Sequence, residues 1–149
     1  MPSLSLVVSV YNKPERLRLV LEACKRQSFR DFEVVIGDDG SDEQVADLIA
    51  ELQRECRFPL IHLWHEDRGW RKNTMLNKAI RAARGTHLVF IDGDCIPSTH
   101  FLTDHWNERR ERKVILGRRA EMSQRWSEEL TPEKIRDGSF ERLGWKELL

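Results

Sequence analysis

Apolar residues along the chain follow two alternating patterns. Runs that are apolar at nearly every position are typical of strands buried on both faces, and they cover residues 4–10, 32–36, 60–64 and 87–91. Between these runs, apolar residues recur every three or four positions, which predicts helices. We expect the helices over residues 14–24, 41–56, 71–84 and about 98–112, and a short fifth strand over 114–117. This alternation predicts an α/β fold, with a mainly parallel sheet and helices on both faces.

Two of the expected helices begin with capping signals. Asn12 precedes Pro14 and Glu15, an order that predicts Asn12 as the N-cap of the first helix. Ser41 is followed three residues later by Gln44, which resembles a capping box and predicts Ser41 as the second N-cap. Each cap lies in a turn that connects a strand to the next helix.

The alternating pattern weakens after Gly117. We therefore expect residues 1–117 to form one domain and residues 118–149 to form a helical tail. The tail is rich in large apolar residues, which indicates that it packs on the domain or on a partner, including a second copy of the chain. These residues are Trp126, Phe140, Leu143, Trp145, Leu148 and Leu149.

Composition argues against several classes of protein. The chain has 25 basic and 25 acidic residues, and this balance argues against a general nucleic-acid binder. The three cysteines are widely spaced and form neither a disulfide framework nor a CxxC metal site, which favours a reduced, cytoplasmic setting. Apolar runs are too short for a membrane span, and a signal-peptide pattern is not apparent. A peripheral contact with a membrane stays open.

Two carboxylates directly follow the run of residues 87–91. Asp92 and Asp94 flank Gly93, and ligands of open α/β sheets bind at the carboxyl ends of the strands. Carboxylates this close repel each other unless a cation lies between them, and oxygen ligands suit Mg²⁺ or Mn²⁺. Gly93 allows the backbone to turn and a ligand to approach. We favour a divalent-metal site over the alternative, a glycine-centred turn with a capping Asp.

Polar residues also follow the first two strands. Asp38 and Asp39 end the second strand, where a carboxylate can accept hydrogen bonds from the N–H groups of a ligand. Tyr11 follows the first strand and offers a flat face on which a planar base can stack. The alternatives are a simple strand-to-helix turn for the two acids, a surface aromatic for Tyr11 and a capping role for Asn12.

A basic cluster marks the expected start of the third helix. Arg68, Arg71 and Lys72 surround this position, and cations beside a helix N-terminus favour phosphate binding. The alternative is a solvated basic turn. Because the cluster is expected at the same edge of the sheet as the acidic residues, we retain it as a candidate phosphate site.

The histidines and Cys95 do not suggest a further catalytic or metal-binding site. His65 and Glu66 lack the second histidine of a zinc protease motif. His62 and His87 lie in expected strands, as packed or edge residues. Cys95 has no histidine partner in the sequence, so we expect a small apolar role for it rather than a nucleophilic one.

These segments together resemble the nucleotide-sugar half of family 2 glycosyltransferases, which have the GT-A (Rossmann-like) fold. The resemblance covers residues 3 to about 117, and its segments occur in the same order and spacing as in the family. The matching segments are residues 6–14, 27–36, 38–41, 77–85 and 89–94. Asp92-Gly93-Asp94 looks like the DXD motif of that family.

The resemblance implies an activity and a set of site residues. The activity is transfer of a sugar, with inversion, from a nucleotide-diphospho sugar (usually UDP) to a hydroxyl of a glycan, a lipid or another acceptor, as in polysaccharide biosynthesis. The implied cofactor is Mn²⁺ or Mg²⁺, with Asp94 as the main ligand and Asp92 beside it towards the ribose or sugar. The implied nucleotide-sugar contacts are Ser9, Tyr11, Asn12, Asp39, Arg71, Lys72, Asn77, Asp92, Gly93 and Asp94.

The chain also departs from the family pattern. Family members usually carry Ala-Arg-Asn-x-Gly where this chain has residues 75–79, of which only Asn77 matches. The family's acceptor half and catalytic base lie well beyond the DXD motif, whereas 55 residues follow Asp94 here. We therefore expect a compact or truncated acceptor half, and we assign no catalytic base.

Three alternatives to a complete transferase are considered. A nucleotide-sugar-binding module without transfer activity would need a partner to supply the acceptor half. A phospho-acceptor signalling domain would place its acidic pair after the first strand, where this chain has Tyr11 and Asn12. A dinucleotide-binding oxidoreductase is disfavoured because no G-x-G-x-x-G motif follows a strand.

Overall fold

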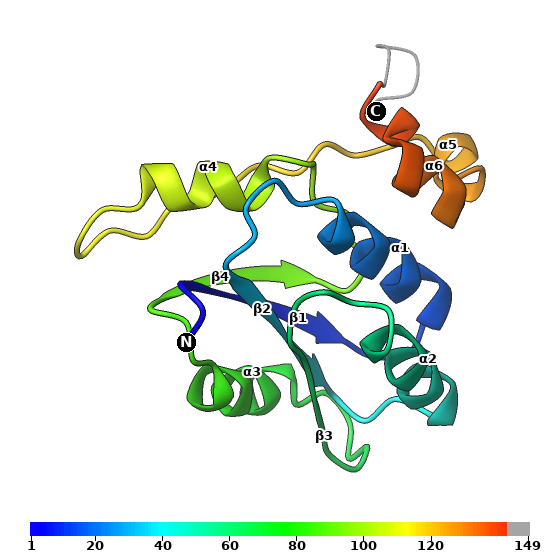
Figure 1. The fold of residues 1–149 in the computed structure, drawn as a ribbon. Coiled ribbons are helices and arrows are strands. Elements are labelled where there is room, and N and C mark those ends of the chain that lie inside the picture. Colours follow the sequence, from blue (N-terminus) through cyan, green and yellow to red (C-terminus); the bar gives the residue numbers. More distant parts are fainter. Residues whose placement is uncertain (143–149) are drawn as a thin grey trace.

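Four parallel strands form the central layer of the protein in a computed structural model, which describes residues 1–142 (Figure 1). The strands are β1 (Leu4–Val10), β2 (Phe32–Asp38), β3 (Leu60–Trp64) and β4 (His87–Asp92). Their order in the sheet is β3-β2-β1-β4. Val10 is in register with Asp38, and Ser9 is in register with Asp92. The carboxyl ends of β1, β2 and β4 therefore meet at one edge of the sheet.

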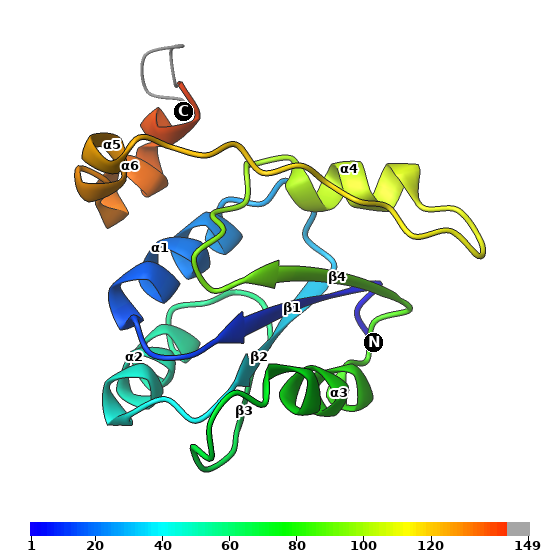
Figure 2. The same cartoon turned by 180° about the vertical axis from the view of Figure 1, so that it is seen from behind.

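Helices cover both faces of this sheet (Figures 1 and 2). The main helices are α1 (Pro14–Lys25), α2 (Glu43–Gln53), α3 (Lys72–Ala82) and α4 (Phe101–Glu108). Apolar side chains of α1, α2 and α4 join one core cluster with Leu6 and Ile36 of the sheet. On the opposite face, Ala79 of α3 packs with Val7 and Val35. The structure confirms the predicted mainly parallel sheet with helices on both faces.

The alternation of side chains explains the continuous apolar runs. Successive residues of a strand point to opposite faces, so Leu6 and Val8 enter the core under α1 and α2, whereas Val7 points towards α3. All seven residues of β1 and all seven of β2 are buried. Strand β4 differs, because Phe90, in register with Val7, is 48% exposed.

The predicted fifth strand is wrong. Residues 114–117 form no strand in the described structure, and the side chains of Val114 and Leu116 are 87% and 89% exposed. The apolar run has strand propensity, but a strand also needs a hydrogen-bonding partner. The chain between α4 and α5 (Gln124–Glu128) instead runs outside the sheet (Figure 1). Helix α4 is also shorter than the predicted 98–112.

The predicted capping residues are wrong as well. The N-cap of α1 is Lys13, in the left-handed region and without a side-chain cap, and the N-cap of α2 is Asp42. Asn12 Oδ1 accepts a hydrogen bond from the Asp42 N–H (3.1 Å), and the Asn12 N–H donates to Ser41 Oγ (2.8 Å). Both polar side chains therefore join the turn after β1 to the turn after β2, instead of capping their own helices.

Short helices follow the β-sheet region and pack on α1. Helix α6 (Pro132–Asp137) contributes Ile135 to a small core with Leu19 and Ala23 of α1. The 3-10 helix η1 (Ser139–Glu141) follows α6 in the chain. The domain boundary at residue 117 stays a prediction. The predicted packing residues Leu143, Trp145, Leu148 and Leu149 lie outside the described residues. Within residues 1–142, none of the helices has both the length and the apolar character needed to cross a membrane.

Candidate functional site

A cleft of about 410 Å³ lies at the carboxyl edge of the sheet. It is formed by the ends of β1, β2 and β4, the start of α3, the loop after β3 and Arg119. Eight of the ten predicted nucleotide-sugar contacts line it, namely Ser9, Tyr11, Asn12, Asp39, Lys72, Asp92, Gly93 and Asp94. These eight residues, up to 85 positions apart in the sequence, thus share one cavity, as predicted for strand ends of a parallel sheet.

Asp38 braces the fold behind this cleft. Its side chain is 1% exposed. Oδ1 accepts a hydrogen bond from the Ser41 N–H (2.8 Å), and Oδ2 lies 2.9 Å from Nε2 of His62. Burial opposes ionisation of Asp38, but the hydrogen bonds from His62 and Ser41 outweigh it and hold the pKa below its usual range. Asp38 therefore shapes the turn and does not line the cleft.

Asp39 faces the cleft with a carboxylate that is held on both sides. Oδ1 lies 2.7 Å from Nε2 of His65, and Oδ2 accepts a hydrogen bond from the Arg71 N–H (2.9 Å). The Asp39 N–H also donates to the Val10 carbonyl (2.9 Å). Only 8% of Asp39 is exposed. Its position and orientation are therefore fixed by residues from three separate segments.

Gly40 allows the loop after β3 to approach this turn. Its φ of +99° lies in the region that favours glycine, and a Cβ at this position would lie 2.6 Å from Cα of Asp67. The close approach brings His65 and Asp67 beside the end of β2. A larger residue at position 40 would displace the loop that supports Asp39.

Asp92 is the last residue of β4, and its carboxylate pairs with a lysine side chain of the same chain. Its Oδ1 accepts a hydrogen bond from Ser9 Oγ (2.9 Å) and forms an ion pair with Lys72 Nζ. The Lys72 ammonium, with Ser9 helping, holds the pKa of Asp92 below its usual range although partial burial opposes this. Lys72 was predicted as a phosphate contact, and the structure places it against Asp92, the first carboxylate of Asp92-Gly93-Asp94.

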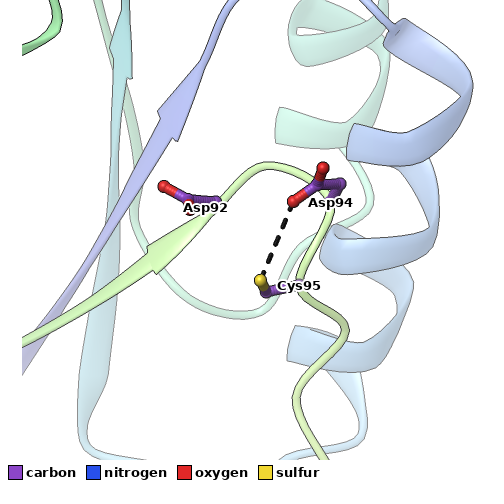
Figure 3. A group of neighbouring side chains, drawn as sticks. All are labelled: Asp92, Asp94 and Cys95. Atoms are coloured by element: carbon purple, nitrogen blue, oxygen red, sulfur yellow. Dashed lines mark hydrogen bonds between the residues drawn. The ribbon is translucent and has the colours of Figure 1, made fainter. Parts of the chain in front are cut away.

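The turn after Asp92 brings a second carboxylate to the cleft. The Gly93 N–H donates to the Ser9 carbonyl (2.8 Å), and a Cβ at Gly93 would lie only 3.0 Å from that oxygen. Asp94 follows in an exposed position beside Cys95, as Figure 3 shows. One ligand atom each of Asp92, Asp94 and Cys95 lies within 4.8 Å of the others. The turn therefore gathers three groups that can hold a metal ion.

The chemistry of these groups fits a hard divalent ion held by oxygen. Asp94 offers an exposed carboxylate, the ligand type that Mg²⁺ and Mn²⁺ prefer. Burial, together with the Asp94 charge, raises the pKa of the Cys95 thiol, so the thiol stays protonated at neutral pH. A protonated thiol is a poor ligand for such an ion. Asp94 is therefore the better candidate ligand, and Asp92 is already paired with Lys72.

Two aromatic side chains flank the mouth of the cleft. Tyr11 is 53% exposed, and its hydroxyl donates to Asp67 Oδ2 (3.0 Å). This hydrogen bond raises the pKa of Tyr11. Trp70 is 86% exposed and also lines the cleft, after a turn at Gly69 with φ of +82°. The sequence does not predict a role for Trp70, because one tryptophan in a polar loop has no distinguishing pattern.

Two predicted contacts lie outside the cleft lining. The Arg71 guanidinium turns back to the Glu66 carbonyl, and only its backbone N–H reaches Asp39. Asn77 is exposed on α3, more than one turn beyond Lys72. Arg119 does line the cleft but was not predicted, because it follows the irregular segment that we had expected to be a strand.

Comparison with known proteins identifies the family. The profile of the family described as "Glycosyl transferase family 2" matches residues 5–147. The chain belongs to glycosyl transferase family 2. The Bacillus subtilis (strain 168) protein EpsH, named as a glycosyltransferase, is 36% identical over 94 residues, which are 62% of this chain and 26% of EpsH. Validoxylamine A glucosyltransferase of Streptomyces hygroscopicus subsp. jinggangensis is 34% identical over 93 residues, 61% of this chain and 22% of that enzyme.

Solved structures of two other proteins share the fold. TarS of S. aureus, residues 1–349 in complex with UDP-GlcNAc, is 26% identical with a TM-score of 0.59, over 72% of this chain and 30% of that one. The mannosyltransferase PcManGT of Pyrobaculum calidifontis, in complex with GDP-Man and Mn²⁺, is 25% identical with a TM-score of 0.58, over 64% and 28% of the two chains. This family 2 chain thus spans about a quarter of the length of the relatives it matches.

Proposed function

We propose that this chain binds a nucleotide-diphospho sugar, with UDP as the nucleotide, and transfers the sugar to an acceptor hydroxyl with inversion and with the help of Mn²⁺ or Mg²⁺. The observation that carries the proposal is the cleft in which Asp39, Asp92 and Asp94 meet from two different strand ends. Family membership supports the reaction class. The complexes of TarS with UDP-GlcNAc and of PcManGT with GDP-Man support the donor class.

The nucleoside would lie at the β1 and β2 side of the cleft. The Asp39 carboxylate would accept a hydrogen bond from a base N–H, and Tyr11 would stack on the base or the ribose. Asn12 follows Tyr11 and also lines the cleft, in the turn that is tied to Ser41. Ser9 holds Asp92 and would help to orient the ribose side. In this proposal, four residues at the carboxyl ends of two neighbouring strands bind and orient the nucleoside.

The diphosphate would lie at the β4 side. Asp94, with Asp92 beside it, would hold the divalent ion, which when bound offsets negative charge on a departing diphosphate. Lys72 and Arg119 line the same side of the cleft and would attract the diphosphate. Gly93 leaves room for the ligand against the backbone. Arg71 contributes through its backbone N–H to Asp39, and we propose no direct contact for Asn77.

The acceptor would attack the sugar from the face opposite the diphosphate, which gives inversion. Its class is a hydroxyl of a glycan, a lipid or another molecule, as in polysaccharide synthesis. We assign no catalytic base. A cytoplasmic location, with or without contact to a membrane surface, fits a nucleotide-sugar donor and remains a proposal.

A second candidate function is a nucleotide-sugar-binding module that needs a partner for the acceptor half. One observation favours it: among the described residues β4 pairs with β1 alone, and Phe90 is 48% exposed on the face that α3 covers elsewhere. A partner, or a second copy of the chain joined through the tail, would then cover this side of the sheet.

Donor turnover separates the two functions. Purified chain would be incubated with Mn²⁺ and a panel of UDP-sugars, and released UDP would be measured with and without simple glycan acceptors. A transferase releases UDP, and the Asp94→Ala variant does not. Donor binding by calorimetry without any UDP release would support the binding module, and the absence of both would contradict the proposed function.

A further inference from the structure

A buried histidine stands behind the carboxylate that the proposed function assigns to the nucleobase. His65 is 8% exposed, and its Nε2 lies 2.7 Å from Asp39 Oδ1. It follows β3 in a loop whose neighbouring residues, Glu66 and Asp67, are exposed. Burying an imidazole in an otherwise exposed polar loop costs desolvation free energy unless the ring nitrogens form hydrogen bonds. The hydrogen bond to Asp39 therefore accounts for the burial of His65.

A second neighbour of the ring determines which nitrogen carries the proton. Nζ of Lys78 lies 3.4 Å from Nδ1 of His65. A lysine ammonium has donors and no acceptor, so Nδ1 must accept this hydrogen bond. In the neutral ring the proton then lies on Nε2. His65 therefore donates its N–H to Asp39 and is itself oriented by Lys78 of helix α3.

Asp39 receives one donor on each oxygen. The His65 Nε2–H donates to Oδ1, and the Arg71 N–H donates to Oδ2 (2.9 Å). An ionised carboxylate only accepts hydrogen bonds, and these two donors fix its orientation at the cleft. A ligand group that meets Asp39 must therefore bring a hydrogen of its own.

We propose that His65 is a positioning residue that orients the acceptor-only carboxylate of Asp39, so that it selects a base with an N–H at ring position 3. Uracil has such an N–H at N3, whereas cytosine has a lone pair there. The inference rests on the proposed function and adds to it the residue that sets base selectivity. The measurable consequence is a preference for UDP over CDP that depends on His65.

The neighbouring histidine–aspartate pair is a matched control. His62 Nε2 lies 2.9 Å from Asp38 Oδ2, at the end of the same strand pair, but neither residue lines the cleft. Changes at His62 and His65 remove the same type of hydrogen bond from adjacent aspartates. A general structural role would affect both variants alike, and base reading would affect only the one at His65.

The test compares UDP and CDP affinities in the presence of Mn²⁺. For His65→Leu we expect the UDP preference to fall about tenfold, the size of one hydrogen bond to a charged group. His65→Gln can place an amide N–H near the Nε2 position and should retain most of the preference. His62→Leu should leave it unchanged. Pyrophosphate, which has no base, should bind wild type and His65→Leu equally.

A double-mutant cycle shows whether His65 acts through Asp39. In an Asp39→Asn background, His65→Leu should cause no further loss of UDP preference. A nitrogen-15 NMR spectrum of the wild-type imidazole needs no variant, and it should show the Nε2–H tautomer for His65. Lys78→Met, an exposed change, should reduce the preference about threefold because it removes the donor to Nδ1.

The outcomes separate the inference from the proposed function. If wild type binds neither UDP nor CDP with Mn²⁺, both fail. If it binds UDP and CDP equally, if a folded His65→Leu keeps the preference, or if pyrophosphate weakens by the same factor as UDP, the inference alone is overturned. The Nδ1–H tautomer at His65 would overturn it in the wild-type protein.

Discussion

The acidic pairs at the ends of β2 and β4 lie at the same edge of the sheet but in opposite environments. Each carboxylate oxygen of Asp38 and Asp39 has a protein partner, and the partners are Ser41, His62, His65 and Arg71. At the end of β4, Asp92 is paired with Ser9 and Lys72, whereas Asp94 is exposed and has a contact of 3.7 Å from Cys95 Sγ. The first pair is held by the fold on every oxygen, whereas in the second pair Asp94 remains available to a ligand.

This difference shows that carboxylates at one edge of a sheet can serve either to stabilise the fold or to bind a ligand. A carboxylate whose oxygens all have protein donors holds its orientation and stabilises the surrounding turn. A carboxylate that faces solvent contributes little to folding, but it can exchange water for a metal ion. A variant that damages one end should therefore leave the other largely unchanged.

The largest expected effect is on stability at the β2 end. Asp38→Ala removes the acceptor of two hydrogen bonds in a side chain that is 1% exposed, so it should lower the free energy of unfolding by about 3 kcal/mol. Urea unfolding measures this. The matched change Asp94→Ala should alter stability by no more than about 0.5 kcal/mol. Equal losses in both variants would contradict the comparison.

The next effect is on metal binding at the β4 end. Asp94→Ala should weaken Mn²⁺ binding at least about tenfold, because it removes the exposed carboxylate that faces the cleft. The electron paramagnetic resonance signal of free Mn²⁺ reports this directly. Cys95→Ser serves as the control and should change the affinity little, since its thiol stays protonated. Unchanged Mn²⁺ affinity in Asp94→Ala would place the metal elsewhere.

The sequence predicted this edge well where the signal was local. Asp39 and Asp92 each follow an apolar run, and the parallel alternation brings the ends of β1, β2 and β4 together. His65 carried no such signal, because its contact with Asp39 exists only when the loop after β3 packs on Gly40. Arg119 was missed for a related reason, since it reaches the cleft from an irregular segment.

The errors in the prediction have a common physical cause. Residues 114–117 have strand propensity but pair with no strand in the described structure, and Val114 is 87% exposed. Asn12 is a good capping residue, yet its side chain binds the Asp42 N–H of the neighbouring turn. The presence of a non-local partner at Asn12, and its absence at residues 114–117, decided the local structure, and composition and spacing reveal neither.

The smallest effect concerns pH and again separates the two ends. Hydrogen bonds hold the pKa of Asp38 below its usual range, despite burial. Its contribution to stability is therefore complete above the unfolded pKa of about 3.9 and is lost as pH falls through the lower folded value. Compared with Asp38→Asn, wild type should be more stable at pH 7 by about 1 kcal/mol, and this advantage should shrink below pH 4. An advantage that is constant from pH 7 to pH 3 would contradict this assignment.

The most direct test of the donor site is calorimetry of UDP binding to the wild-type chain with and without Mn²⁺. The account predicts one UDP bound per chain in Mn²⁺ and an affinity at least tenfold lower when the ion is chelated, since in the proposed site Asp94 would contact the diphosphate through the metal. Absence of UDP binding in Mn²⁺, or equal affinity with and without it, would contradict the account.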